Sequence, residues 1–155
     1  MGTCPWPQGD PLMTKYHNEE WGRPVTNDRK IFEFLILESA QAGLSWLTIL
    51  RKREGYRRNF ANFDPQEVAK FRKRDISRLM KDPGIVRNRL KIEATINNAQ
   101  KFLEVQKEFG TFSKYMWRFV GGKPIDGKRK SVTAGIQVSR SNRHLCAHAS
   151  GWYGQ

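Results

Sequence analysis

The chain has few cysteines and no long hydrophobic run. Only two of its 155 residues are Cys, at positions 4 and 146. Two cysteines are too few for a disulfide scaffold in a chain of this length, and they fit a reducing compartment. No apolar run approaches the roughly 20 residues of a membrane span, and the first residues have neither the basic nor the apolar region of a signal peptide. We therefore expect a cytoplasmic protein without a membrane partner.

Strand-like alternation is also missing. No stretch alternates convincingly between apolar and polar residues, and there is no repeat or low-complexity region. This pattern favours helices over strands. The apolar fraction is only 38%, but it includes five Trp and nine Phe, which can build a compact core from few residues. We therefore expect a monomeric, all-α domain.

Acidic residues are scarce relative to basic ones. There are 28 Lys and Arg against 15 Asp and Glu, so the formal net charge is +13. Such an excess indicates a polyanionic partner, with nucleic acid ahead of an anionic membrane surface. The alternative is a merely soluble basic protein. Five of the basic residues lie past Asp126, where there is no acid, so +5 of the charge belongs to the tail and +8 to the rest of the chain.

Caps and apolar periodicity predict where the helices lie. The first 25 residues read as a Pro- and Gly-punctuated arm. The next segment, which carries Glu38, can be capped by Thr26, Asn27 or Asp28 and is broken by Gly43. Later helices are expected at 46–60 after a Ser45 cap, 63–71 with Asp64 as cap and Pro65 first, 74–82 begun by Asp75, 89–110 ended by Gly110, and 111–122.

The segment LMKDPGIVRNRLKIEA, residues 79–94, reads as a hairpin between two of these helices. Pro83 and Gly84 predict a tight turn, in which Gly84 can take a positive φ. The N–H groups at the start of the next helix attract phosphate, and nearby cations strengthen the attraction. We interpret the segment as a helix-hairpin-helix that binds the DNA backbone through Gly84, Ile85, Arg87, Arg89 and Lys91. The alternative is an ordinary Pro-Gly turn beside a solvated basic face.

The segment IFEFLILESAQAGLSW, residues 31–46, places a carboxyl group in a very apolar helix. A lone buried carboxylate is costly unless it is paired, hydrogen-bonded or neutralised. Trp46 follows Glu38 beyond the Gly43 break, and Tyr16 and Trp21 lie on the N-terminal arm. A carboxylate among aromatic rings suits a flat cation or a base flipped out of DNA. The alternative is that Glu38 accepts hydrogen bonds from main-chain N–H groups of the arm and the aromatic residues form core.

Two long segments, residues 10–65 and 84–99, resemble the bacterial 3-methyladenine DNA glycosylase I family, and LE-x-x-QAGLSW is specific to it. The resemblance covers residues 2 to about 125. It implies an all-α helix-hairpin-helix glycosylase domain that hydrolyses the N-glycosidic bond of 3-methyladenine in damaged double-stranded DNA, without strand cleavage. It also implies that Glu38 contacts the extruded base, that Tyr16 and Trp46 form the pocket around it, and that Trp6 and Trp21 lie nearby.

The resemblance further implies a structural zinc ion bound by two Cys and two His. Cys4 and His17 match the N-terminal pair. The other two ligands belong to a C-terminal pattern that this chain lacks. His144, Cys146 and His148, near the C-terminal end of the chain, could complete a site with Cys4 and His17. A segment that did not evolve as part of the family fold, however, rarely supplies the geometry that a metal ion needs.

The resemblance stops after GGKPID, and residues 135–155 resemble nothing in the family. We therefore expect a glycosylase domain over 1–125 and an aberrant tail over 126–155 that is not a domain. One choice of codons for residues 135–155, read one nucleotide later, gives GFKFLGPTVICAHMQAVGMVN, which resembles the family's C-terminal pattern. We interpret the tail as a frameshift product; the alternative is a divergent but selected tail.

Two other functions are weighed against a glycosylase. A catalytically impaired DNA-binding fragment of such an enzyme is the alternative function. A helix-turn-helix regulator is disfavoured, because no second helix presents obvious base-reading side chains.

Overall fold

The structure, a computed structural model, describes residue 6 and residues 9–122. Over that part of the chain every regular element is a helix, which confirms the predicted all-α class. The chain divides into two compact units. We call Thr26–Met116 the central unit, and Met1–Val25 with Trp117–Gln155 the terminal unit. The predicted tail, residues 126–155, lies outside the described residues, so its boundary stays a prediction.

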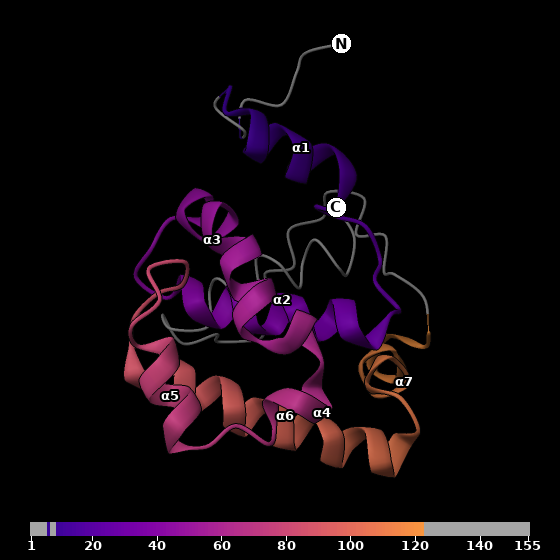
Figure 1. The fold of residues 1–155 in the computed structure, drawn as a ribbon. Helices are drawn as coiled ribbons and strands as arrows, with labels where there is room; N and C mark the ends of the chain where they lie inside the picture. Colours follow the sequence, from indigo (N-terminus) through magenta and orange to yellow (C-terminus); the bar gives the residue numbers. More distant parts are fainter. Residues whose placement is uncertain (1–5, 7–8, 123–155) are drawn as a thin grey trace. The chain divides into compact units, whose positions relative to one another are not determined.

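The central unit contains most of the described helices (Figure 1). It also contains most of the buried apolar side chains. Helix α2 packs against α3 and α6, and the short helices α4 and α5 also pack against α6. The bounds in this unit are α2 Asp28–Gln41, α3 Trp46–Asn59, η1 Ala61–Phe63, α4 Pro65–Val68, α5 Lys73–Leu79, α6 Arg89–Phe109 and α7 Phe112–Trp117, whose last residue belongs to the terminal unit. The terminal unit contains α1 Pro11–Glu19 and η2 Arg118–Val120.

Several predicted helix ends are confirmed. The side chains of Asn27, Ser45 and Asp64 cap α2, α3 and α4 by accepting hydrogen bonds from main-chain N–H groups of the first turn. Gly43 follows the end of α2 with φ +79°, and Gly110 ends α6 with φ +81°. Both values lie in the region that glycine adopts most easily, so these two breaks follow from local chemistry.

Two other boundaries were predicted wrongly. Helix α5 begins at Lys73 rather than at Asp75, and the Asp75 carboxylate instead accepts the Arg72 N–H at 3.0 Å from inside the first turn. The N-terminal arm contains α1, whose cap Asp10 accepts the N–H groups of Leu12 and Met13. The polar composition of α1 gave little periodicity, but an Asp cap before a first-turn Pro was a usable signal.

Three consecutive non-glycine residues link α3 to α4 in a left-handed turn. Ala61, Asn62 and Phe63 have φ values of 47°, 53° and 57°. This conformation costs an L-residue about 1–2 kcal/mol. Phe60, just before the turn, and Phe63, its last residue, are 0% and 2% exposed. Their burial offsets the strain, because covering one such ring is worth roughly 1.5–3 kcal/mol.

Asp28 joins the start of α2 to the connection between α6 and α7. Its carboxylate accepts the N–H groups of Phe112 and Ser113 at 2.8 and 2.9 Å. It also accepts the side-chain amide of Gln106 at 2.6 Å. Asp28 therefore lies in the first turn of α2 and also caps the start of α7. These hydrogen bonds join two parts of the central unit that are more than 80 residues apart in sequence.

Helix α3 and the hairpin pack at two glycines. A Cβ atom on Gly55 would overlap the carbonyl oxygen of Gly84, and one on Gly84 would lie 3.3 Å from the Gly55 Cα. Gly84 is not among the glycines with positive φ, which corrects the expectation from sequence. A Cβ at this position would instead crowd the Asp82 carboxylate, at 2.8 Å, as well as the main chain of Gly55. No side chain of any size fits at Gly55 without moving the hairpin.

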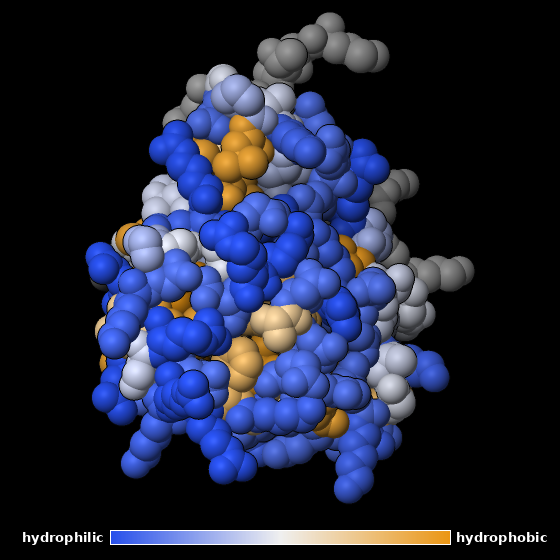
Figure 2. All heavy atoms as spheres, in the orientation of Figure 1, coloured by the Kyte–Doolittle hydropathy of each residue, from blue (hydrophilic) through white to orange (hydrophobic). Residues whose placement is uncertain are grey.

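The surface is mainly polar. Figure 2 shows that hydrophilic residues cover most of the face drawn, with apolar groups in separate small patches. None of the described helices is long and apolar enough to cross a membrane.

Gly55→Ala is expected to destabilise the protein by about 2–4 kcal/mol, because the added methyl group separates α3 from the hairpin. Chemical denaturation would measure the free energy of unfolding. Glu54→Ala is the matched control, since Glu54 is the neighbouring exposed residue with a surface ion pair to Arg57. An equal, small effect of both changes would contradict the close packing.

Candidate functional site

Glu38 lies in the second half of α2, in the central unit, and its carboxyl group is largely withdrawn from water. Burial raises the pKa of Glu38 to about 8, because removing a carboxyl group from water disfavours its charged form. Trp46 is the first residue of α3 and is 6% exposed. Because α2 packs against α3, these two predicted site residues belong to one packed helix pair.

The turn between α2 and α3 separates Glu38 from Trp46. Ala42 follows α2 as its C-cap, and Leu44 donates its N–H to the Gln41 carbonyl at 2.6 Å. Ser45 then caps α3 by accepting the Thr48 N–H at 3.2 Å. Residues 42–45 are all exposed, so hydrogen bonds rather than packing determine the path of this turn.

The other predicted pocket residues form an aromatic cluster in the terminal unit. Trp6 and Trp21 stack with ring centroids 5.5 Å apart, and Tyr16 lies 6.3 Å from Trp6. Tyr16 is 3% exposed, whereas Trp6 is 39% exposed. The structure therefore brings Tyr16, Trp6 and Trp21 together, in a different unit from Glu38 and Trp46.

His17, the predicted zinc ligand, belongs to the same aromatic cluster. Its ring stacks on Trp21 at 5.2 Å, and its Nδ1 lies 3.0 Å from the side-chain oxygen of Asn18. Within residue 6 and residues 9–122, no group of three His, Cys, Asp or Glu side chains could hold a metal ion. Cys4 lies outside the described residues. The described residues alone therefore do not form a zinc site.

The hairpin residues have distinct environments. Ile85 is 2% exposed and anchors the turn in the core. Arg87 is exposed just before α6, and Arg89, in the first turn, pairs with Glu93 at 2.8 Å. The ammonium group of Lys91 instead donates to the carbonyl oxygens of Ala40 and Ala42 at 2.9 and 2.6 Å. Two of its N–H groups thus bind main chain, a role that the sequence did not indicate.

A polar network behind the hairpin was also missed. The buried Asn59 of α3 donates its amide to the Gly55 carbonyl at 2.9 Å and to the Asp82 carboxylate at 2.8 Å. Asp82 also accepts the Gly84 N–H at 2.6 Å, and these two hydrogen bonds lower the pKa of Asp82. Lys52 donates to the Pro83 carbonyl at 2.7 Å. One face of α3 therefore determines the main-chain path of the hairpin.

Helix α2 also holds a buried acid, Glu33, which sequence reasoning overlooked. Its carboxylate accepts hydrogen bonds from Arg53 at 2.7 Å, Lys30 at 2.9 Å and Arg57 at 3.2 Å. Burial alone would raise the pKa of Glu33, but the hydrogen bonds and charges of Arg53 and Lys30 outweigh it and hold the pKa below its ordinary value. The sequence did offer a signal for this ion-pair network. Lys30 lies three positions before Glu33 on the same helix, and α3 carries several basic residues.

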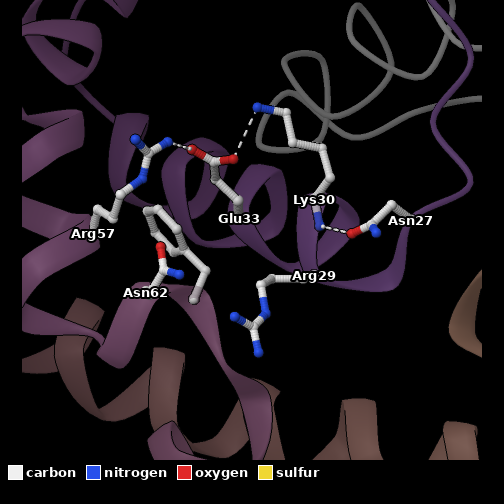
Figure 3. Close-up of a pocket in the computed structure, with 7 residues that line it drawn as sticks. Asn27, Arg29, Lys30, Glu33, Arg57 and Asn62 are labelled. Carbon is white, nitrogen blue, oxygen red and sulfur yellow. Dashed lines mark hydrogen bonds and ion pairs between the residues drawn. The ribbon is translucent and has the colours of Figure 1, made fainter.

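Figure 3 shows the hollow that this network lines, with the Glu33 carboxylate between Lys30 and Arg57. Its volume is about 310 Å³. Arg29, at its edge, pairs with Asp64 at 2.8 Å, and Arg57 also pairs with Glu54 at 2.8 Å. Each cation here thus has an acidic partner. The hollow contains none of the residues predicted to bind a base or DNA, and we interpret its charges as structural.

Comparison with known proteins identifies the family. The methyladenine glycosylase family model matches residues 6–147, a range that extends past the predicted boundary at 125. DNA-3-methyladenine glycosylase 1 of Escherichia coli is 46% identical over 124 residues, which are 80% of this chain and 66% of that protein. The DNA-3-methyladenine glycosylase of Haemophilus influenzae is 44% identical over 141 residues, which are 89% of this chain and 76% of that protein.

Solved structures agree with this assignment. The 3-methyladenine DNA glycosylase I of Staphylococcus aureus has a TM-score of 0.78 and 40% identity, with 94% of this chain and 78% of that chain covered. A variant of 3-methyladenine DNA glycosylase I in complex with 3-methyladenine has a TM-score of 0.81 and 38% identity, with 100% and 83% covered. The resemblance seen in the sequence is confirmed, and the chain belongs to the methyladenine glycosylase family.

Proposed function

We propose that this protein is a monofunctional DNA glycosylase, which hydrolyses the N-glycosidic bond of 3-methyladenine in damaged double-stranded DNA. The observation that carries the proposal is the desolvation of the Glu38 carboxyl group on α2. Helix α2 packs against α3, whose first residue is Trp46. The names of the relatives in E. coli and H. influenzae support the reaction. We further propose that the protein acts as a monomer in the cytoplasm.

The chemistry asks little of the protein beyond recognition and positioning. Methylation at N3 makes the base cationic in DNA, so the base is already a good leaving group and needs no protonation. The protein must bind the extruded base, orient it, and stabilise the positive charge that develops on the sugar as the bond breaks. An ionised Glu38 would attract the cationic base, and the indole of Trp46 would offer a face for stacking.

The ionisation of Glu38 then depends on its ligand. With a pKa of about 8, most of the free protein carries a neutral Glu38 at pH 7. A cationic base lowers the pKa of a nearby carboxyl group, so binding of the cation releases a proton. An undamaged, neutral base gains no such charge interaction. A partly buried carboxyl group that ionises more readily beside a cation therefore favours the alkylated base over normal ones.

DNA binding is assigned to the hairpin and the start of α6. Arg87 is exposed, and the first N–H groups of α6 follow it in sequence. A helix N-terminus with neighbouring cations binds phosphate without reading base sequence. The hairpin main chain is held by α3 through Asn59 and Lys52. A rigid hairpin suits a protein that must hold the backbone while one base leaves the stack.

The first test is release of 3-methyladenine from methylated duplex DNA by the purified chain. We expect kcat/KM to rise with pH and to level off above about pH 8, because the ionised carboxylate of the free enzyme is the competent form. Glu38→Gln should lower kcat/KM by about 100-fold and remove this dependence. Glu54→Gln, at an exposed site, is the control. Binding of DNA without release of base would instead support the fragment alternative.

The pH dependence of the free energy of unfolding distinguishes a base-binding role of Glu38 from a structural one. Burial raises its pKa from 4.5 to about 8, so between these values the folded state retains a proton that the unfolded state has lost, and stability falls as pH rises. Glu38→Gln should therefore be more stable than the original protein at pH 8, with a gap that shrinks towards pH 4.5. A large loss of stability at every pH would mean that the carboxylate is bonded within the fold.

Arg87→Ala should weaken binding to undamaged duplex DNA and reduce the slope of log K against log salt by about 0.9, the value for one lost phosphate contact. Fluorescence anisotropy at several salt concentrations would measure both quantities. Lys101→Ala is the control, because Lys101 is exposed later on α6 and pairs with Glu104. Equal slopes for both variants would remove Arg87 from the interface.

A structural zinc ion remains a prediction from the resemblance, based on Cys4 and His17. Because the tail lacks the family's C-terminal pattern, we expect well below one zinc per folded chain by elemental analysis. A stoichiometric ion that is lost, with unfolding, in His17→Ala would instead show that the tail supplies ligands. The nucleotide sequence of the gene tests the frameshift directly.

A further inference from the structure

Lys91 joins the helix that follows the hairpin to the turn beside the candidate base site. It lies in the first turn of α6, three residues after the Asn88 cap. Its ammonium group donates to the Ala40 carbonyl at 2.9 Å and to the Ala42 carbonyl at 2.6 Å. These contacts span 51 and 49 residues of sequence. A long-range contact of this kind reflects tertiary structure and not local helix chemistry.

The two carbonyls lie at the end of α2, where a helix has main-chain acceptors without partners. The last four carbonyls of any helix lack an N–H donor from within it. At α1 and α3 the C-cap residue donates its own N–H back into the helix, from Glu20 to Tyr16 and from Phe60 to Tyr56. At α2 the ammonium of Lys91 contributes instead, and its charge also complements the negative end of the helix dipole.

The ammonium is partly withdrawn from water where it makes these bonds. Burial lowers the pKa of Lys91 below its ordinary value, whereas the turn itself, residues 42–45, is exposed. An exposed turn that contains Gly43 at φ +79° has little packing to determine its conformation. The two hydrogen bonds from Lys91 therefore restrain this turn from outside it, in addition to the Leu44 and Ser45 hydrogen bonds within it.

We propose that Lys91 is a positioning residue, which sets the Glu38–Trp46 geometry by holding the α2–α3 turn against the start of α6. The proposal rests on the proposed function, because it concerns the site at which that function places the base. It differs from the role expected from sequence, a phosphate contact. Since Lys91 follows the hairpin directly, it also links the element assigned to the DNA backbone with the element assigned to the base.

The test compares Lys91→Met with Lys91→Arg and with Lys101→Met, a control on an exposed face of the same helix. We expect Lys91→Met to lower kcat for 3-methyladenine release by about 10- to 100-fold, the cost of misplacing reacting groups. Its KM, its affinity for undamaged duplex and its salt slope should not change. Lys91→Arg should restore part of kcat, because a guanidinium can also donate to two carbonyls. Lys101→Met should behave like the original protein.

Hydrogen exchange gives a readout that does not depend on activity. Amides of residues 42–46 should exchange faster in Lys91→Met than in the original protein, with little change in α6. If the original chain releases no base, the proposed function fails, but the exchange comparison still decides whether Lys91 holds the turn. If Lys91→Met does not fold, Lys91→Gln, which keeps a neutral donor, replaces it in each comparison.

Two results would overturn the proposal. One is unchanged exchange at residues 42–46 in a folded Lys91 variant, which would show that other contacts hold the turn. The other is an unchanged kcat together with weaker binding to undamaged DNA and a salt slope reduced by about 0.9, which is the signature of a phosphate contact. The Arg87→Ala variant provides the reference for that second pattern.

Discussion

The main-chain contact between α3 and the hairpin, at Gly55 and Gly84, leaves no room for a side chain and constrains how the central unit packs. Around it, Lys52 and Asn59 of α3 bond the hairpin through Pro83 and Asp82. The same helix begins at Trp46, at its other end. Because a helix is stiff along its length, the contact at Gly55 sets the hairpin position relative to the start of α3. The relative position of the hairpin and the start of α3, to which we assign backbone binding and base binding, therefore depends on the main-chain contact between Gly55 and Gly84.

On helix α2, different environments shift the pKa values of two glutamate side chains in opposite directions. Glu33 has three cationic partners, and two of them, Arg53 and Lys30, together outweigh burial and keep its pKa below the ordinary value. Glu38, five residues later, has its pKa raised to about 8 by burial. The first stabilises the packing of α2 on α3 as a permanent anion. The second is poised to change charge near neutral pH, which suits the base-binding role that we propose for it.

The turn between α2 and α3 has little packing of its own, and a side chain far away in sequence holds it. Residues 42–45 are exposed, and the Lys91 ammonium binds the carbonyls that precede and follow Gln41. Asp28 has a comparable role at the opposite end of α2, where its carboxylate caps α7. Both ends of α2 are thus held by charged side chains bonded to main chain far away in sequence. This arrangement keeps the helix that carries Glu38 in a defined position within the central unit.

Local chemistry was sufficient to predict the helix class, the caps at Asn27, Ser45 and Asp64, and the glycine breaks at Gly43 and Gly110. Each depends on residues within one helical turn, so the sequence alone determines it. The reason for Gly84, the partners of Glu33 and the contacts of Lys91 were decided only by tertiary structure. They depend on groups brought together from more than one helix, and neither periodicity nor capping carries information about which distant main-chain atoms will lie within hydrogen-bonding reach.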